Sequence, residues 1–151
     1  MHSFSIKELF PLIEEGIKNG GKYRFYPRGI SMLPLIREGK DSVVFTELSE
    51  IEKYDIVLYV RDNGDFVLHR VVNIRAGLYD MCGDNQCVVE RGIRKDQIKA
   101  AVSGIYRDDE FVSLKDPRYL KYVKDRVASI PVRYFKMRIK SLFGKIFKEG
   151  K

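Results

Sequence analysis

The sequence predicts a mainly β, α+β domain that begins with one helix and ends in a basic helical tail. Helical apolar spacing is confined to the first 19 residues and to the stretch after Pro117, and short runs rich in Val, Ile, Phe and Tyr lie between them. The chain has 151 residues, 44% of them hydrophobic, which suits one core. We therefore expect a body at residues 1–114 and a tail at residues 115–151.

The leading helix is expected over residues 5–19. Ser5 can cap it, and Glu8 stands three residues on, as a capping box requires. Asn19-Gly20-Gly21 would end it. One face of the predicted helix is apolar and consists of Ile6, Leu9, Phe10, Ile13 and Ile17.

Strands are expected wherever a short β-branched and aromatic run is bounded by turn residues. These runs are 22–26, 42–46, 56–60, 66–74, 78–82, 98–106 and 111–114. The Asp-Asn-Gly-Asp segment at 62–65 predicts a hairpin turn between the third and fourth of them. Residues 82–92, which contain Gly-Asp-Asn, offer two carboxylates, and their alternative interpretation is a polar turn after a strand.

The positive charge of the chain is concentrated in the tail. Residues 1–114 hold 16 Lys/Arg and 18 Asp/Glu, a net charge of −2, whereas residues 115–151 hold 12 and 3, a net charge of +9. The body is therefore not expected to bind nucleic acid. Residues 132–148 predict a basic amphipathic helix, which could pack on the body or, as the pattern favours, bind an anionic membrane. An RNA or another acidic partner is a further alternative.

No apolar run is long enough to span a bilayer, and the first 15 residues do not resemble a secretory signal. We therefore expect a cytoplasmic protein, held peripherally at the inner membrane face if the tail binds lipid. Cys82 and Cys87 are interpreted as ordinary free thiols, because two cysteines without a nearby His do not make a zinc site. No metal and no cofactor are predicted.

Ser31 is the first candidate for chemistry. It lies in the turn Gly29-Ile30-Ser31-Met32-Leu33-Pro34, where its hydroxyl could point outward and the backbone amides of Gly29 and Ser31 could hold an oxyanion. Met32 and Pro34, beside it, are candidate substrate contacts. Taken alone, a Ser between Gly and Pro is usually only a turn residue.

His69 is the second candidate, since a serine nucleophile needs a base and imidazole has a suitable pKa. It is the only His of the body after His2, and a structural role would equally fit its apolar strand. Asp84 and Glu90 are two carboxylates that could orient the imidazole. Which of the two does so stays open.

In order and spacing these segments resemble the signal peptidase I family within the LexA-like superfamily, over about residues 22–106. The matching segments are GISMLPLIREGKDSVVF, YDIVLYV, VLHRVV, GDNQCVVERGI and IKAAVSGIY. The resemblance implies a LexA/signal-peptidase-like β domain and a serine endopeptidase that processes a leader peptide or a protein at the inner membrane face.

The resemblance also implies roles for single residues. Ser31 matches the nucleophile, and His69 matches the general base, which is Lys in most bacterial members and His in the endoplasmic-reticulum and archaeal type. Asp84 matches the Asp of the Gly-Asp-Asn box, and Glu90 falls where the His type has a catalytic Asp. Tyr54 replaces a Gly of the family pattern.

Two other functions fit parts of this pattern. The first is a catalytically idle, peptidase-like binding or regulatory module at the membrane surface, because sequence order does not fix the geometry of a Ser–His pair. The second is a LexA-like transcriptional regulator, which would need a helix-turn-helix domain. Only one helix precedes the predicted strands, so this second alternative is disfavoured.

Overall fold

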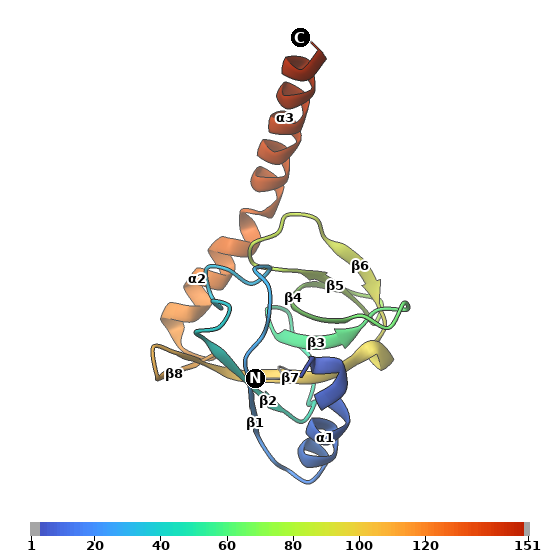
Figure 1. Cartoon of the computed structure of the whole chain (residues 1–151), viewed down its shortest axis with the longest axis vertical. Coiled ribbons are helices and arrows are strands. Elements are labelled where there is room, and N and C mark those ends of the chain that lie inside the picture. The colour runs from blue at the N-terminus through green and yellow to red at the C-terminus, as the bar shows by residue number, and fades with distance from the viewer. Residues whose placement is uncertain (1–3, 150–151) are drawn as a thin grey trace.

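The computed structural model describes residues 4–149 and forms an α+β protein with a mainly β body, as predicted (Figure 1). All strand pairs are antiparallel, and the eight-stranded sheet has the order β1-β2-β7-β3-β4-β5-β6, with β8 paired to β7. The elements are α1 (Ile6–Lys18), β1 (Tyr23–Phe25), β2 (Ser42–Thr46), β3 (Ile56–Val60), β4 (Phe66–Arg75), β5 (Leu78–Cys82), β6 (Glu90–Ile93), a short 3-10 helix (Lys95–Gln97), β7 (Ile98–Arg107), β8 (Glu110–Ser113), α2 (Pro117–Ala128) and α3 (Ile130–Glu149).

Helix α1 forms as predicted. The Ser5 side chain accepts from the Glu8 N–H, and the Glu8 carboxylate accepts from the Ser5 N–H at 2.7 Å, which completes the capping box. Phe10, Ile13 and Ile17 are buried on the face that packs against the sheet. The apolar stripe of the sequence thus becomes one wall of the core.

Both faces of the sheet are covered, which explains why its central strands read as continuous apolar runs. In β3, Ile56 and Leu58 belong to the core under α1, whereas Val57 and Tyr59 belong to a second core on the opposite face. This alternation continues into β4, because the hairpin register places His69 opposite Val57. His69 therefore lies on the face of Tyr59.

Strand β6 corrects the alternative interpretation of residues 82–92 as one polar turn. The segment Glu90–Ile93 pairs with β5 through Met81 opposite Glu90 and Tyr79 opposite Ile93. Only Ile93 of this strand is buried. With one apolar anchor beside charged residues and a glycine, β6 carries almost no periodic signal in the sequence.

The predicted tail consists of two helices with different surroundings. Helix α2 packs on the body through Tyr119 and Val123, which are buried. Helix α3 begins at Ile130, with Pro131 in its first turn, where a missing N–H costs no helical hydrogen bond. It projects from the body on the side away from α1 (Figure 1). Among residues 4–149, no helix has the length and the apolar composition needed to cross a membrane.

Candidate active site

The Ser31 turn is held in place by two neighbouring residues whose side chains lie in the hydrophobic core. Met32 and Ile36 are buried at 4% and 2% exposure, and Ile36 N–H donates to the Met32 carbonyl at 3.0 Å. Met32 was expected to contact substrate; its side chain packs in the core under α1, and it also lines the pocket of Ser31. Pro34 is exposed but lines a different cavity, together with Arg107.

A second loop, residues 83–86, holds the Ser31 turn against the sheet. Asn85 N–H donates to the Ser31 carbonyl at 2.9 Å, and the Asn85 side-chain amide donates to the Ile30 carbonyl at 3.1 Å. A Cβ on Gly83 would lie 2.5 Å from the Ser31 carbonyl oxygen and 3.1 Å from His69 Cδ2. Only glycine therefore fits at this position, and the Ser31 carbonyl and the His69 ring both border Gly83.

The strand that carries His69 has an open edge beside Ser31. Residues 66–69 pair with β3, but in the described chain β5 pairs with β4 only from Arg70 onward. Ser31 lines a pocket with Phe66, Val67 and Leu68, which are residues of this unpaired edge. The pocket thus combines a partly exposed hydroxyl with free backbone groups of a strand, the arrangement that an extended peptide can join.

The His69 imidazole is buried, with 4% of the residue exposed. Its Nδ1 lies 3.3 Å from the Tyr59 hydroxyl, the ring's one hydrogen-bond partner within residues 4–149. Burial, helped by the positive charge of Arg61, lowers the pKa of His69 to about 4. The ring is therefore neutral at physiological pH, which is the form that accepts a proton.

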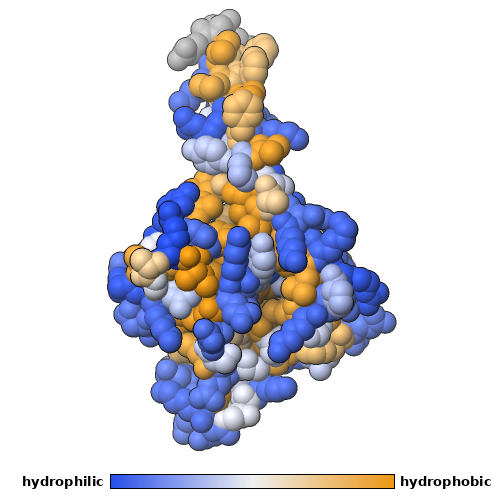
Figure 2. Space-filling view, turned by 180° about the vertical axis from the view of Figure 1, so that it is seen from behind, coloured by the Kyte–Doolittle hydropathy of each residue, from blue (hydrophilic) through white to orange (hydrophobic). Residues whose placement is uncertain are grey.

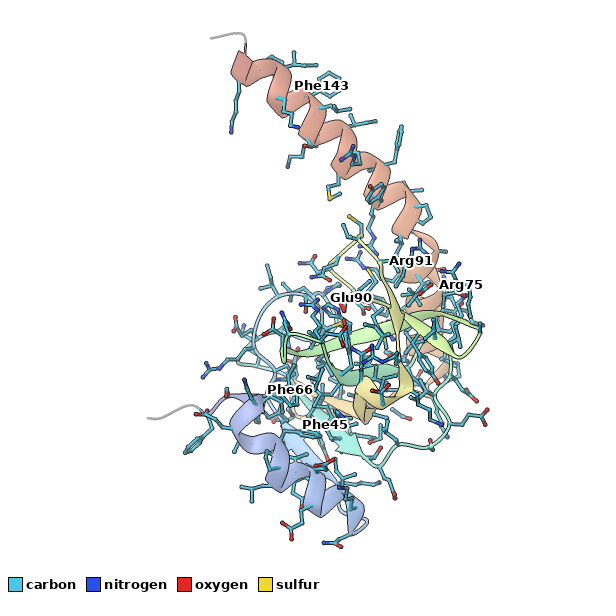
Figure 3. The ribbon with its side chains drawn as sticks, turned by 90° about the vertical axis from the view of Figure 1, so that its right-hand side faces the viewer. Phe45, Phe66, Arg75, Glu90, Arg91 and Phe143 are labelled. Carbon is cyan, nitrogen blue, oxygen red and sulfur yellow. The ribbon has the colours of Figure 1, made fainter. Side chains whose placement is uncertain are left out.

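Glu90, labelled in Figure 3, is opposite Met81, which lies in the core on the face of Tyr59 and His69. Its carboxylate pairs with Arg61, with Oε2 at 2.8 Å from Arg61 Nη2 and 2.9 Å from Nε. Burial and then the nearby Glu90 charge raise the pKa of the Tyr59 hydroxyl. Tyr59 therefore stands between the imidazole and the Glu90–Arg61 pair.

Asp84 lies on the other side of the strand. Its two oxygens accept from Arg70 Nε and Nη2 at 2.8 and 2.7 Å, and Tyr122 on α2 donates to it at 3.0 Å. Because successive side chains of a strand point to opposite faces, Arg70 and its partner Asp84 are turned away from His69. Of the two candidate carboxylates, Glu90 is thus the one on the imidazole's face, and its charge acts on the Tyr59 hydroxyl, the partner of the ring.

The two backbone amides expected to form an oxyanion hole differ in their surroundings. Gly29 N–H donates to the Glu38 carboxylate at 2.9 Å, so it is already occupied. Ser31 N–H has no protein acceptor within residues 4–149. One of the two predicted donors is thus available.

His69 also lines an open groove of about 580 Å³ with Arg61, Glu90, Asn85 and, from α3, Met137. Sequence reasoning missed Tyr59, Arg61 and Arg70 as members of the site. The hairpin turn at 62–65 held the signal for Tyr59, since it sets the register that brings Tyr59 beside His69. No protein-family model and no curated protein matches this chain.

Proposed function

We propose that this protein is a serine endopeptidase in which Ser31 is the nucleophile and His69 the general base. The observation that supports this most directly is the pocket between Ser31 and the unpaired edge of β4, directly before His69. A peptide paired with this edge would be held extended, with a carbonyl carbon within reach of the Ser31 hydroxyl. The substrate class is an extended segment of a polypeptide.

In the proposed reaction, Ser31 Oγ attacks the carbonyl carbon while His69 takes the hydroxyl proton. The negative oxygen that forms is stabilised by the free Ser31 N–H. His69 then protonates the leaving amine, the peptide bond breaks, and an acyl-enzyme remains on Ser31. Water, deprotonated by the same imidazole, releases the acid product.

Tyr59 supplies the orientation that this reaction requires. When Nδ1–H donates to the Tyr59 oxygen, Nε2 is the unprotonated nitrogen and can serve as the base. The Tyr59 hydroxyl can in turn donate to the Glu90 carboxylate, which stabilises the imidazolium form through one intervening hydroxyl. Glu90 would thus act at a distance, with Arg61 fixing its position.

A defined mixture of unrelated synthetic peptides tests the proposal. The full chain is incubated with the mixture, and new termini are identified by mass spectrometry. We expect cleavage at a restricted set of sequences by the natural chain and by Ser49→Ala, a change at an exposed serine in a loop outside the pocket. Absence of every cleavage product from the folded natural chain would contradict an endopeptidase.

The occupied Gly29 amide favours a second candidate, a module that binds peptides at the β4 edge without cutting them. This candidate predicts saturable peptide binding that leaves the peptide intact. Equilibrium binding of the same peptide mixture to the natural chain and to Ser31→Ala, followed by mass spectrometry of the peptides, separates the two. Binding without cleavage by both chains would favour the module.

The pH dependence of cleavage reports the burial of His69. The imidazole works as a base only when neutral, and its pKa is lowered to about 4 from 6.5. We therefore expect kcat/KM to keep its value as the pH falls through 6.5 and to decline only near pH 4. Circular dichroism at each pH confirms that the chain stays folded. A decline centred near the ordinary histidine pKa would contradict a buried base.

Tyr59→Phe tests the orienting hydroxyl. Removing it leaves Nδ1 without its partner, and we expect kcat to fall about 10-fold, the value of roughly one hydrogen bond. KM should change little, because Tyr59 touches the base and not the peptide. Tyr79→Phe, in the same core, is the matched control. Equal kinetics of the two variants would remove Tyr59 from the mechanism.

A further inference from the structure

Helix α3 leaves the body soon after it begins. Near its start Arg133 Nη1 donates to the Gln86 carbonyl at 2.5 Å, and Met137 Sδ lies 3.5 Å from Cys87 Sγ. From Lys140 to Lys148 every residue is exposed. The outer half of the helix thus stands free of the domain (Figure 1).

Helix α3 carries a largely exposed apolar face along its length. The side chains of this face lie on the side of the helix opposite Met137. They therefore point away from the loop with Gln86 and Cys87 that contacts the first turns of α3. Exposure reaches 64% for Phe135 and Ile146, values that a packed helix would not show. Figure 2 shows this apolar surface, and Figure 3 shows Phe143 on the side turned away from the body. The face consists of Val132, Phe135, Ile139, Leu142, Phe143 and Ile146.

The flanks of this apolar face are positively charged. Helical geometry places Lys136 and Lys140 along one border and Arg138 and Lys145 along the other. The helix holds six Lys/Arg in all, so pairing it with the same helix of a second copy would bring twelve cations together. Nucleic acid would match the charge but would leave the apolar face exposed. A surface with anionic groups outside and apolar material beneath them would match both the positive borders and the apolar face of the helix.

We infer that α3 lies along an anionic lipid surface. Its aromatic and aliphatic side chains enter the boundary between headgroups and acyl chains, and the bordering Lys and Arg side chains contact lipid phosphates. Met137, on the opposite side of this helix, lines the groove that contains His69, so the groove lies across the helix from the lipid. The lipid contact does not require peptidase activity, so the two proposals can fail separately.

Co-sedimentation of the full chain with lipid vesicles tests how much the positive charges of α3 contribute to lipid binding. We expect binding to vesicles of phosphatidylcholine and phosphatidylglycerol in equal amounts, and little binding to phosphatidylcholine alone. The triple change Lys136→Gln, Lys140→Gln, Lys145→Gln should weaken binding about 100-fold, since each cation near the surface contributes on the order of a fivefold factor. The matched control neutralises Lys7, Lys18 and Lys22, exposed lysines on and just after α1 at the opposite end, and should bind like the natural chain.

A second variant tests the apolar component, which salt does not screen. Phe135→Ser with Phe143→Ser should weaken binding to the anionic vesicles roughly 10-fold or more. Both side chains are exposed, so the fold should not depend on them. Phe4→Ser with Leu12→Ser, two exposed apolar residues at the opposite end, is the control and should leave binding unchanged.

Three outcomes would overturn the inference. The first is no binding to anionic vesicles, and the second is equal binding by the natural chain and both α3 variants. The third is a dimer of the lipid-free chain, by light scattering, that the Phe135 and Phe143 changes dissociate, since the apolar face would then belong to a second copy.

Discussion

Ser31→Ala is expected to abolish peptide cleavage, and His69→Gln is expected to lower kcat by about a thousandfold or more. The reason is that nucleophile and base act as one unit, so loss of either removes nearly all of the covalent pathway. Initial rates on the best-cleaved peptide measure both effects. Ser49→Ala is the matched serine control and should cleave at the natural rate.

The double variant, with both Ser31 and His69 changed, tests whether the two residues act together. If Ser31 and His69 form one unit, the double variant is no slower than the worse single variant. Cleavage by Ser31→Ala at the natural rate would show that another residue is the nucleophile. Additive losses in the double variant would mean that His69 supports catalysis without acting on Ser31.

Asp84→Asn is expected to lower the free energy of unfolding by about 3 to 5 kcal/mol, the typical cost of leaving a buried charge without its partner. The Arg70 and Asp84 side chains are 0% and 2% exposed, and their pairing is bidentate. Urea unfolding measures the loss. Asp62→Asn breaks an exposed pair with Arg94 and should change stability by less than about 1 kcal/mol.

The same variant separates the two carboxylates that the sequence left open. Because Asp84 faces away from His69, the folded fraction of Asp84→Asn should retain most of its kcat. Glu90→Gln should do the reverse, with a small loss of stability and a clear fall in kcat, because in the proposed mechanism Glu90 stabilises the imidazolium through the Tyr59 hydroxyl. A fully stable Asp84→Asn that has lost kcat would assign the orienting role to Asp84.

Much of the fold was predictable because the local sequence pattern and the tertiary environment favour the same secondary-structure elements. The strands β2 and β3 match the expected residues 42–46 and 56–60, where β-branched runs end at polar turns. Helix α1 matches because its capping residues and apolar stripe point to the same element. Strand β6 was missed because only Ile93 anchors it, and its pairing with β5 supplies the rest.

The candidate site was predictable only in part. The order of Ser31 and His69 in the chain suggested the pair, but the Ser31 carbonyl and the His69 ring come close together only because Gly83, which borders both, has no side chain. Spacing along residues 83–90 could not assign Asp84 and Glu90 to faces of the sheet. That assignment follows from strand register, which is a property of the paired strands and not of the loop.

Covalent labelling of the natural chain by a fluorophosphonate tests whether Ser31 is an activated nucleophile, because the reaction requires an activated serine but no known substrate. In the reaction Ser31 Oγ displaces fluoride from phosphorus, and the adduct is located by intact-mass measurement and peptide mapping. We expect one adduct per chain, on Ser31, and a much slower reaction in His69→Gln. An adduct on a different residue, or none on the folded chain at neutral pH, would contradict the proposal that Ser31 is the nucleophile.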